Sequence, residues 1–183
     1  MTKQPSLTTP RLILRPFTFA DAPAVQRLAG DRSIADTTAN IPHPYEDGMA
    51  EMWISSHAEQ FEQGTGVVFA ITLKDTGELV GAISLFSIRA ASSRAEMGYW
   101  IGVPYWNKGY CSEAAKALIG YGFNELGLNR VFAEHMVRNP GSGRVMEKAG
   151  MTYEGTLRQH VKKGDRYEDL KVYGILRTEF SGG

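Results

Sequence analysis

Runs of apolar residues, bounded by turn residues, predict a chain rich in β-strands. Two of these runs lie on either side of Asp75-Thr76-Gly77, and a short turn of this kind is typical of a β-hairpin. A second pair flanks the turn Lys162-Lys163-Gly164-Asp165 near the end of the sequence. The predicted strands, about six to seven in one sheet, cover residues 12–16, 67–73, 79–86, 94–102, 130–136, 152–161 and 167–177.

Apolar residues three or four positions apart predict the helices. The first begins after Asp21, a residue type that caps helices, and carries Val25, Leu28 and Ala29 on one face. Further helices are predicted at residues 46–62, 109–126 and 141–149, the last ended by Gly150. The proline-containing stretch at residues 31–47 predicts an irregular loop. Strands dominate the middle and two helices interrupt them late, so we expect an α+β fold with a mixed central sheet flanked by helices.

Length and charge narrow the class of protein. The chain has 183 residues, the size of a single domain, which we place at residues 8–180. Lysine plus arginine equals aspartate plus glutamate, 20 against 20, so no excess of positive charge is available for a nucleic-acid backbone. No apolar run approaches the ~20 residues that span a bilayer. The single cysteine, Cys111, excludes an internal disulfide and favours a reducing, cytoplasmic location. We expect neither a nucleic-acid nor a membrane partner.

Residues 106–114, with the sequence WNKGYCSEA, lead from a predicted strand into a predicted helix and could bind an anion. Unpaired N–H groups and the dipole at a helix N-terminus attract anions. Gly109 allows a tight turn, and the small residues Cys111 and Ser112 leave the amides accessible. Lys108 adds positive charge. The spacing matches neither a Walker A loop nor a dinucleotide-binding fingerprint. An ordinary strand–helix turn is the alternative interpretation.

A second turn from strand to helix follows at residues 138–144, where Asn139 could simply cap the helix. Together the two turns and their flanking strands resemble the GNAT superfamily of N-acetyltransferases. Within it, the chain looks most like the branch that acetylates the N-terminal amines of ribosomal proteins, the RimJ/RimL-like enzymes. The motifs that carry this resemblance are TPRLILRP at residues 9–16, AEMGYWI at 95–101, the 106–114 turn, Asn139-x-x-Ser142, EKAGM at 147–151 and Gly164-Asp165-x-Tyr167-x-Asp169.

The resemblance implies a single-domain GNAT fold with acetyl-CoA as co-substrate and no metal. It implies a V-shaped opening between the fourth and fifth predicted strands, residues 94–102 and 130–136, produced by a bulge. A main-chain N–H near Ile101 would polarise the thioester carbonyl there. The turn departs from the family pattern, since Trp106 replaces a polar residue and Cys111 a smaller one, but neither change removes a main-chain donor. The implied cofactor-binding residues are Ile101, Gly102, Val103, Trp106, Asn107, Lys108, Gly109, Tyr110, Cys111, Ser112, Asn139 and Ser142.

For catalysis the resemblance implies direct attack by a neutral amine, with Asn139 bonding the cofactor or a water and Ser142 protonating the leaving thiolate. Glu96, at the head of the cofactor strand, is the first candidate for the general base. The alternative is a charge on the solvent face of a strand or in an ion pair that lines the cleft. Cys111 is interpreted as a spacer rather than an acyl-carrying nucleophile. Many superfamily members have a tyrosine acid where this chain has Met146.

Other residues remain secondary candidates. Asp165 and Asp169 could serve as bases or anchor the final hairpin, and His160 could be a base or a partly buried strand histidine. The acceptor side could include residues of the predicted 46–62 helix and its surroundings, namely His43, Trp53 and His57, and packing in the core or on the surface is the alternative.

The predicted function is acetyl transfer from acetyl-CoA to a primary amine, first of all a protein N-terminus. A small amine such as an amino acid, polyamine or aminoglycoside is the alternative acceptor. A non-catalytic acyl-CoA sensor is the rival from another class. The sequence is compatible with a monomer or a homodimer.

Overall fold

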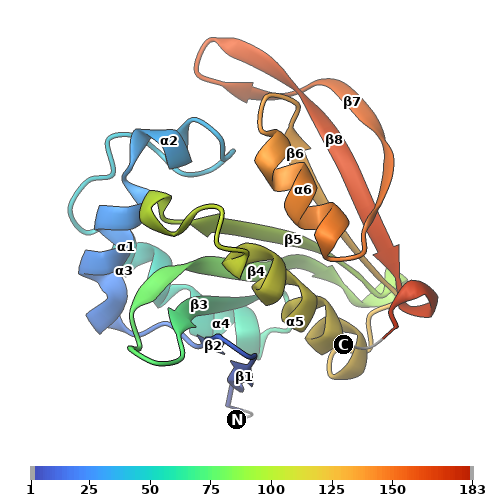
Figure 1. The fold of residues 1–183 in the computed structure, drawn as a ribbon, viewed down its shortest axis with the longest axis horizontal. Helices are drawn as coiled ribbons and strands as arrows, with labels where there is room; N and C mark the ends of the chain where they lie inside the picture. Colours follow the sequence, from blue (N-terminus) through green and yellow to red (C-terminus); the bar gives the residue numbers. More distant parts are fainter. Residues whose placement is uncertain (1–2, 182–183) are drawn as a thin grey trace.

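The computed structural model describes residues 3–181, and its centre is one eight-stranded sheet in the order β1-β2-β3-β4-β5-β6-β8-β7 (Figure 1). The strands are β1 (Leu7–Thr8), β2 (Leu12–Arg15), β3 (Val67–Leu73), β4 (Leu79–Arg89), β5 (Arg94–Ile101), β6 (Arg130–Met136), β7 (Thr152–Lys163) and β8 (Arg166–Leu176). The α-helices are α1 (Ala22–Ala29), α2 (Arg32–Ala35), α3 (Met49–Ser55), α4 (His57–Glu62), α5 (Tyr110–Asn124) and α6 (Pro140–Lys148). Short 3₁₀ turns are η1 (Phe19–Asp21), η2 (Ala90–Ser92), η3 (Val103–Tyr105) and η4 (Arg177–Glu179). The predicted α+β fold is confirmed.

Two apolar clusters pack on the sheet. In the larger one, Leu118 and Ile119 of α5 and Met146 of α6 lie against inward residues of the strands. In the smaller one, α1 and α3 pack against strand residues that include Trp100. Side chains alternate between the faces of a strand. Accordingly, Ala95 and Met97 of β5 belong to the first cluster and Trp100 to the second.

The sheet is split between β5 and β6. These strands are parallel and pair only at Arg94↔Arg130, Ala95↔Val131 and Glu96↔Phe132. On its other side β5 pairs antiparallel with β4 as far as Ile101. The predicted V-shaped opening between the fourth and fifth predicted strands is therefore confirmed, and it begins just beyond Glu96. The register of the β4–β5 pair shifts in β4, between Phe86 and Arg89. This bulge therefore lies on the side of β5 that faces β4, not on the side of the opening.

Three local predictions need correction. The strand β1, which no apolar run indicates, brings the sheet to eight strands by pairing with Leu14 and Ile13. The predicted 46–62 helix is interrupted at Ser56, whose hydroxyl donates to the Trp53 carbonyl (2.8 Å) and competes with the helical hydrogen bonds. The predicted loop at 31–47 contains α2, which the Asp31 carboxylate caps by accepting from the Ser33 N–H (2.8 Å).

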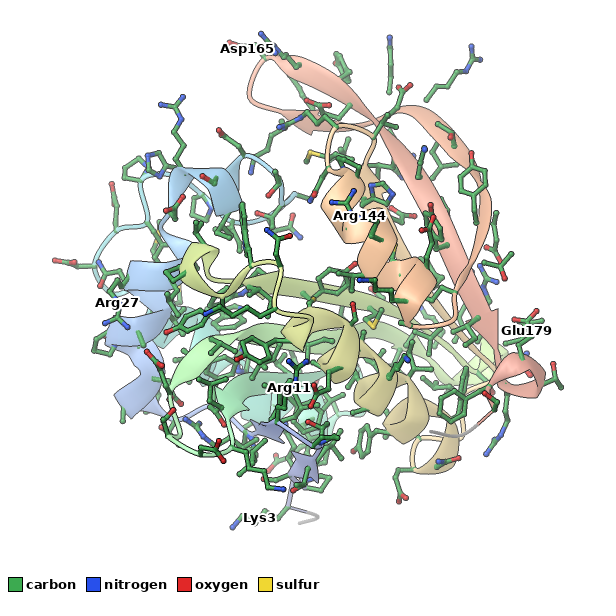
Figure 2. All side chains as sticks on the ribbon, in the orientation of Figure 1. Lys3, Arg11, Arg27, Arg144, Asp165 and Glu179 are labelled. Atoms are coloured by element: carbon green, nitrogen blue, oxygen red, sulfur yellow. The ribbon has the colours of Figure 1, made fainter. Side chains whose placement is uncertain are left out.

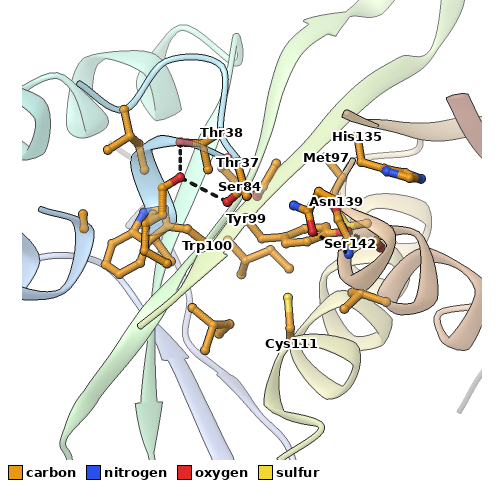
Figure 3. A pocket seen from close by; sticks show the side chains of 18 of the residues that line it. Thr37, Thr38, Ser84, Met97, Tyr99, Trp100, Cys111, His135, Asn139 and Ser142 are labelled. Atoms are coloured by element: carbon orange, nitrogen blue, oxygen red, sulfur yellow. Dashed lines mark hydrogen bonds between the residues drawn. The ribbon is translucent and has the colours of Figure 1, made fainter. Parts of the chain in front are cut away.

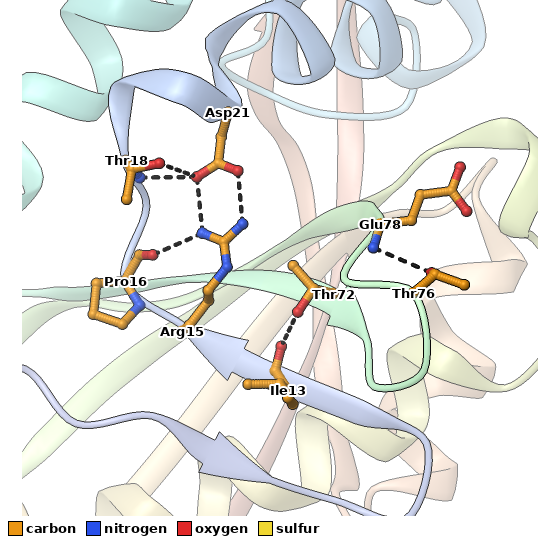
Figure 4. Close-up of polar contacts among 8 residues, drawn as sticks. All are labelled: Ile13, Arg15, Pro16, Thr18, Asp21, Thr72, Thr76 and Glu78. Atoms are coloured by element: carbon orange, nitrogen blue, oxygen red, sulfur yellow. Dashed lines mark hydrogen bonds and ion pairs between the residues drawn. The ribbon is translucent and has the colours of Figure 1, made fainter.

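The entry into α1 depends on an ion pair. Asp21 precedes α1 as predicted, but its carboxylate does not cap that helix. It accepts instead from both Nη atoms of Arg15 (2.8 and 2.7 Å) and from the Thr18 N–H (2.8 Å) (Figure 4). Burial raises the pKa of Asp21, but the bonds from Arg15 and Thr18 outweigh it and hold that pKa below its ordinary value. This pair ties the end of β2 to the start of α1.

The β7–β8 hairpin rises beyond the rest of the sheet, with Asp165 at its tip (Figures 1 and 2). Near the tip, Lys163 Nζ donates to the carbonyl oxygens of Ile41 (3.1 Å) and Ala39 (3.5 Å) in the loop after α2. Arg138 joins the same loop to the hairpin by bonding the Asp36 carbonyl and Glu168 (2.9 Å). None of the helices within residues 3–181 is both long and apolar enough to cross a lipid bilayer.

Candidate active site

A cleft of about 1190 Å³ passes through the split in the sheet. On one face it is lined by the start of α5 and by α6, and on the other by α1, the loop after α2 and α3. Strand β5 runs between the two halves. Figure 3 shows Tyr99, Asn139, Ser142 and Cys111 around the first half and Thr37 and Thr38 on the other side of the strand. We call these halves the α5–α6 half and the α1–α3 half.

The N-terminus of α5 presents main-chain donors to the cleft. Gly109 precedes the helix with a left-handed φ of 80°, and no side chain caps the helix. The first helical hydrogen bond runs from the Glu113 N–H to the Gly109 carbonyl (3.1 Å). The N–H groups of Tyr110, Cys111 and Ser112 precede that bond and have no helical acceptor. This is the arrangement that binds phosphate groups.

Arg11 and Glu113 hold this turn in place. The Glu113 carboxylate accepts from the Arg11 Nε (2.7 Å), the Arg11 N–H (2.8 Å) and the Thr9 hydroxyl (2.6 Å). Arg11 Nη1 also donates to the carbonyl of Lys108 (2.9 Å), and its guanidinium stacks over the Tyr110 ring. Partial burial raises the pKa of Glu113, but the bonds from Thr9 and Arg11 outweigh it and keep the carboxyl pKa below its ordinary value. Arg11 thus balances the negative charge of an acid at the start of α5.

The end of β5 offers main-chain groups to the opening. The Gly102 N–H donates to the Val80 carbonyl (2.9 Å), which continues the β4–β5 register. In an antiparallel ladder, alternate residues bond to the neighbouring strand. The even-numbered residues of β5 therefore bond to β4. Beyond the last pair with β6, Glu96↔Phe132, the N–H and C=O groups of Tyr99 and Ile101 face the opening. At Ile101 the carbonyl already accepts from Trp106 Nε1 (2.6 Å). Its N–H faces the opening by the same register and is the group available to a ligand there.

Tyr99, Asn139 and Ser142 form a connected polar group in the α5–α6 half. Asn139 caps α6 as predicted, because its Oδ1 accepts from the Ser142 N–H (3.3 Å). The Tyr99 hydroxyl lies 2.9 Å from Ser142 Oγ and 3.0 Å from the Ser142 carbonyl oxygen. Burial raises the pKa of Tyr99, so the phenol stays protonated at neutral pH. Burial also raises the pKa of Cys111, which keeps its thiol neutral and agrees with the spacer interpretation.

Glu96 lies in the other half of the cleft. It points away from Ala95 and Met97, so it shares the α1–α3 face with Trp100. Glu134 of β6 lies on the same face, because Ala133 faces the α5–α6 cluster. Partial burial, and next the negative charge of Glu134, raise the pKa of Glu96 to about 7. A carboxyl in this range can accept a proton at neutral pH.

Most of the predicted cofactor residues line the cleft, namely Ile101, Trp106, Asn107, Gly109, Tyr110, Cys111, Ser112, Asn139 and Ser142. Three do not. The Gly102 N–H is used by Val80, Val103 packs in the smaller apolar cluster, and the Lys108 ammonium lies over the Tyr105 ring.

The secondary candidates separate by position. Trp53 lines the α1–α3 half, whereas His57 is buried beneath it against the Trp53 ring. His43 is exposed and bonds the Gly30 carbonyl (3.1 Å). His160 is exposed on β7. Asp165 is at the hairpin tip, and Asp169 anchors the hairpin by accepting from the Gln159 N–H (2.7 Å). Met146 is 1% exposed and belongs to the core.

The sequence reasoning missed four residues that line the cleft. Tyr99 lies two residues from Met97 and from Ile101 along β5. This spacing is the signal that puts its side chain on the same face as theirs, in the α5–α6 half. Along β6, Val131 and Ala133 face the larger apolar cluster, so the same two-residue period puts Glu134 on the opposite face, in the α1–α3 half. Arg144, which Figure 2 labels, and Lys148 lie four residues apart on α6 and supply positive charge to the α5–α6 half. Within residues 3–181, no group of three or more His, Cys, Asp or Glu side chains is arranged to hold a metal ion.

A sheet that opens at the uncapped end of a helix is the architecture of an acyl-CoA-dependent N-acetyltransferase, and the acetyltransferase (GNAT) domain family matches residues 11–152. The chain belongs to this family, and the expected acetyl-CoA-dependent enzyme is thereby confirmed. It is 32% identical over 173 residues to the uncharacterized N-acetyltransferase YoaA of Bacillus subtilis, covering 94% of this chain and 97% of that protein.

Two further proteins with similar sequences are also acetyltransferases. The ribosomal-protein-serine acetyltransferase of Escherichia coli is 33% identical over 115 residues, 63% of each chain. The crystal structure of a GNAT-family acetyltransferase from Bacillus anthracis matches with a TM-score of 0.83 at 30% identity, covering 94% of this chain and 99% of that one.

Proposed function

We propose that this enzyme acetylates the α-amine of a protein or peptide N-terminus, by direct attack of the amine on acetyl-CoA. The observation that carries this proposal is Glu96, a half-buried carboxyl at the point where β5 and β6 diverge, with its pKa raised to about 7 by burial and by Glu134. A peptide α-amine has a pKa of about 8 and a lysine-type amine about 10.4. The pKa of Glu96 is closer to that of the peptide α-amine than to that of the lysine-type amine, so Glu96 is better suited to accept a proton from the α-amine.

The charges that line the cleft support the same acceptor. Within residues 3–181 its only Lys and Arg residues are Arg144 and Lys148, on α6, whereas Glu96 and Glu134 lie in the α1–α3 half. A free amino acid would place its carboxylate among these acids with no cation to receive it. A peptide carries an uncharged amide at that position and needs only a site for its ammonium group. The two carboxylates would also suit an amine with two positive charges, so a polyamine is the second candidate acceptor.

The residues of the α5–α6 half fit acetyl-CoA. The uncapped amides of Tyr110, Cys111 and Ser112 would bond its pyrophosphate, and the free main-chain groups of β5 would pair with the pantetheine arm. When bound, acetyl-CoA supplies an acetyl group activated as a thioester.

Each catalytic step then falls to a residue of this chain. Glu96 accepts the amine proton, directly or through a water, as the amine nitrogen bonds to the acetyl carbon. The Ile101 N–H donates to the carbonyl oxygen as negative charge develops on it. The carbon–sulfur bond breaks, and Ser142 gives a proton to the departing thiolate. Tyr99 positions Ser142 through the 2.9 Å hydrogen bond, and Asn139 holds the same turn. The single cysteine suits the reducing cytoplasm, where we place this activity.

The test is acetylation of a mixed panel of unblocked peptides, free amino acids and spermidine, followed by mass spectrometry and release of free thiol. We expect an acetyl group on peptide α-amines, located by fragmentation. The same peptides with a blocked N-terminus and an internal lysine are the control and should gain nothing. Acetylation of spermidine or amino acids alone would overturn the proposal.

A further inference from the structure

The end of the α1–α3 half that lies away from the strands is an apolar recess. Four half-buried side chains line it: Ile41 and Tyr45 from the loop after α2, and Met49 and Trp53 from α3. Beneath them Val25 and Ala29 of α1 are buried. Bulky apolar side chains left partly uncovered inside a cleft form a surface that an apolar ligand group can cover.

The recess has a rigid wall. The Trp53 ring meets the Phe17 ring edge to face at 5.0 Å between centroids and the His57 ring at 4.5 Å. An aromatic side chain held on two sides loses little freedom when a ligand packs against it, and such preorganisation favours binding.

The two threonines of the recess offer no free hydroxyl donor. Thr37 Oγ1 donates to the carbonyls of Ser33 (2.8 Å) and Ile34 (3.2 Å), and Thr38 Oγ1 donates to the same Ile34 carbonyl (2.9 Å) (Figure 3). Both hydroxyl protons are therefore committed to the main chain of α2. A polar side chain entering the recess would lose water without gaining these donors in return.

Acidic and apolar surfaces thus adjoin in one half of the cleft. Glu96 and Glu134 lie at the opening between β5 and β6, and the recess continues from them toward α3. An acceptor that fits both carries a positive charge beside an apolar group. The first residue of a peptide with a large apolar side chain has this form, with its ammonium group toward Glu96 and its side chain toward Trp53.

Resting on the proposed function, we propose that the recess selects peptide N-termini whose first residue is bulky and apolar, such as Met, Leu or Phe. Trp53 and Met49 are the specificity-determining residues. Serine or alanine at this position leaves the recess uncovered, and aspartate adds a negative charge near Glu96 and Glu134.

The test compares kcat/KM for peptides that differ only in their first residue: Met, Leu, Phe, Ala, Ser and Asp. We expect the Met, Leu and Phe peptides to exceed the Ser peptide by about tenfold or more, since each methylene in an apolar pocket discriminates by at least about that factor. In Trp53→Ala the Met peptide should lose about tenfold in kcat/KM, mostly through KM, while the Ser peptide changes little.

A matched control stands on the same helix. Met52 is 74% exposed and does not line the cleft, so Met52→Ala should leave every ratio unchanged. Met49→Ala removes a smaller part of the wall and tests the recess if Trp53→Ala fails to fold. Peptide acetylation with no preference for apolar first residues, or with Ser preferred, would overturn this inference and leave the proposed function standing. Acetylation of small amines but of no peptide would overturn both.

Discussion

At the scale of single residues, the chemistry depends on which face of a strand each side chain occupies. Tyr99 and Glu96 are three residues apart on β5, so they point to opposite faces of the sheet. Tyr99 reaches Ser142 in the α5–α6 half, and Glu96 lies with Glu134 in the α1–α3 half. One strand therefore carries both the residue that bonds the proposed acid, Ser142, and the candidate base.

Replacing Glu96 with glutamine should lower kcat/KM by about 10²–10⁴-fold, the usual contribution of a general base. In the native enzyme, activity should rise with pH as the Glu96 carboxyl ionises, with its pKa at about 7. In Glu96→Gln only the ionisation of the acceptor amine, at about pH 8, should remain in the profile.

Glu134→Gln provides the companion variant. Removing this negative charge should lower the pKa of Glu96 and move the rising limb to lower pH, while burial keeps that pKa above its ordinary value. A pH–rate profile that is unchanged in Glu96→Gln would show that another group is the base.

At the scale of elements, the start of α5 is held by a segment almost a hundred residues earlier. Arg11, just before β2, bonds both Glu113 within the helix and the Lys108 carbonyl in the preceding turn. Edge strand β1, which pairs with β2, sits beside the same segment. Arg11 of the N-terminal motif TPRLILRP thus braces the turn that we propose to bind the pyrophosphate of acetyl-CoA.

Arg11→Ala should raise KM for acetyl-CoA by about tenfold while kcat changes little, because the turn before α5 loses the bonds that preorganise its amides and Arg11 touches neither reacting atom. The Arg11 side chain is 50% exposed, so the loss of stability should stay below about 1 kcal/mol.

The control for that variant is Arg130→Ala. It breaks another partly exposed ion pair, with Glu154, and Arg130 does not line the cleft. Its KM for acetyl-CoA should match that of the native enzyme, measured by initial rates at varied acetyl-CoA. Equal KM values for Arg11→Ala and the native enzyme would show that Arg11 does not contribute to the binding of acetyl-CoA.

At the scale of the whole molecule, the α1–α3 layer contains a buried histidine without partners. His57 is 6% exposed, and neither ring nitrogen bonds to any other group within residues 3–181. Burial lowers the pKa of His57 to about 4 from its ordinary value of 6.5. The folded state therefore binds this proton less readily than the unfolded chain.

The free energy of unfolding should consequently be fully retained above about pH 6.5 and fall as pH decreases from there to about 4, by about 3 kcal/mol in all. Urea denaturation across this pH range measures the effect. His57→Phe keeps an aromatic ring beside Trp53 and should flatten this part of the curve. An equal slope in both proteins would exclude His57 as its source.

The sequence alone determined the class of fold and the position of the turn that leads into α5. Apolar runs predict seven of the eight strands, because a strand that packs on a core shows its pattern of apolar residues in its own segment of the sequence. Gly109 and Asn139 likewise mark their helix starts locally, through a positive φ in one case and a side-chain cap in the other. The motifs around them carried the resemblance to the GNAT superfamily, because they are contiguous along the chain.

Only the tertiary structure decided which residues meet. The pairing of Tyr99 with Ser142, the Glu134 charge beside Glu96 and the Arg11 brace on α5 each join segments that local patterns treat separately. The structural roles of His57, packed against Trp53, and of Asp169, bonded to the Gln159 N–H, are also visible only in the folded chain. Local patterning follows from propensity and burial along one segment, whereas a site is made by groups that folding brings together from several segments.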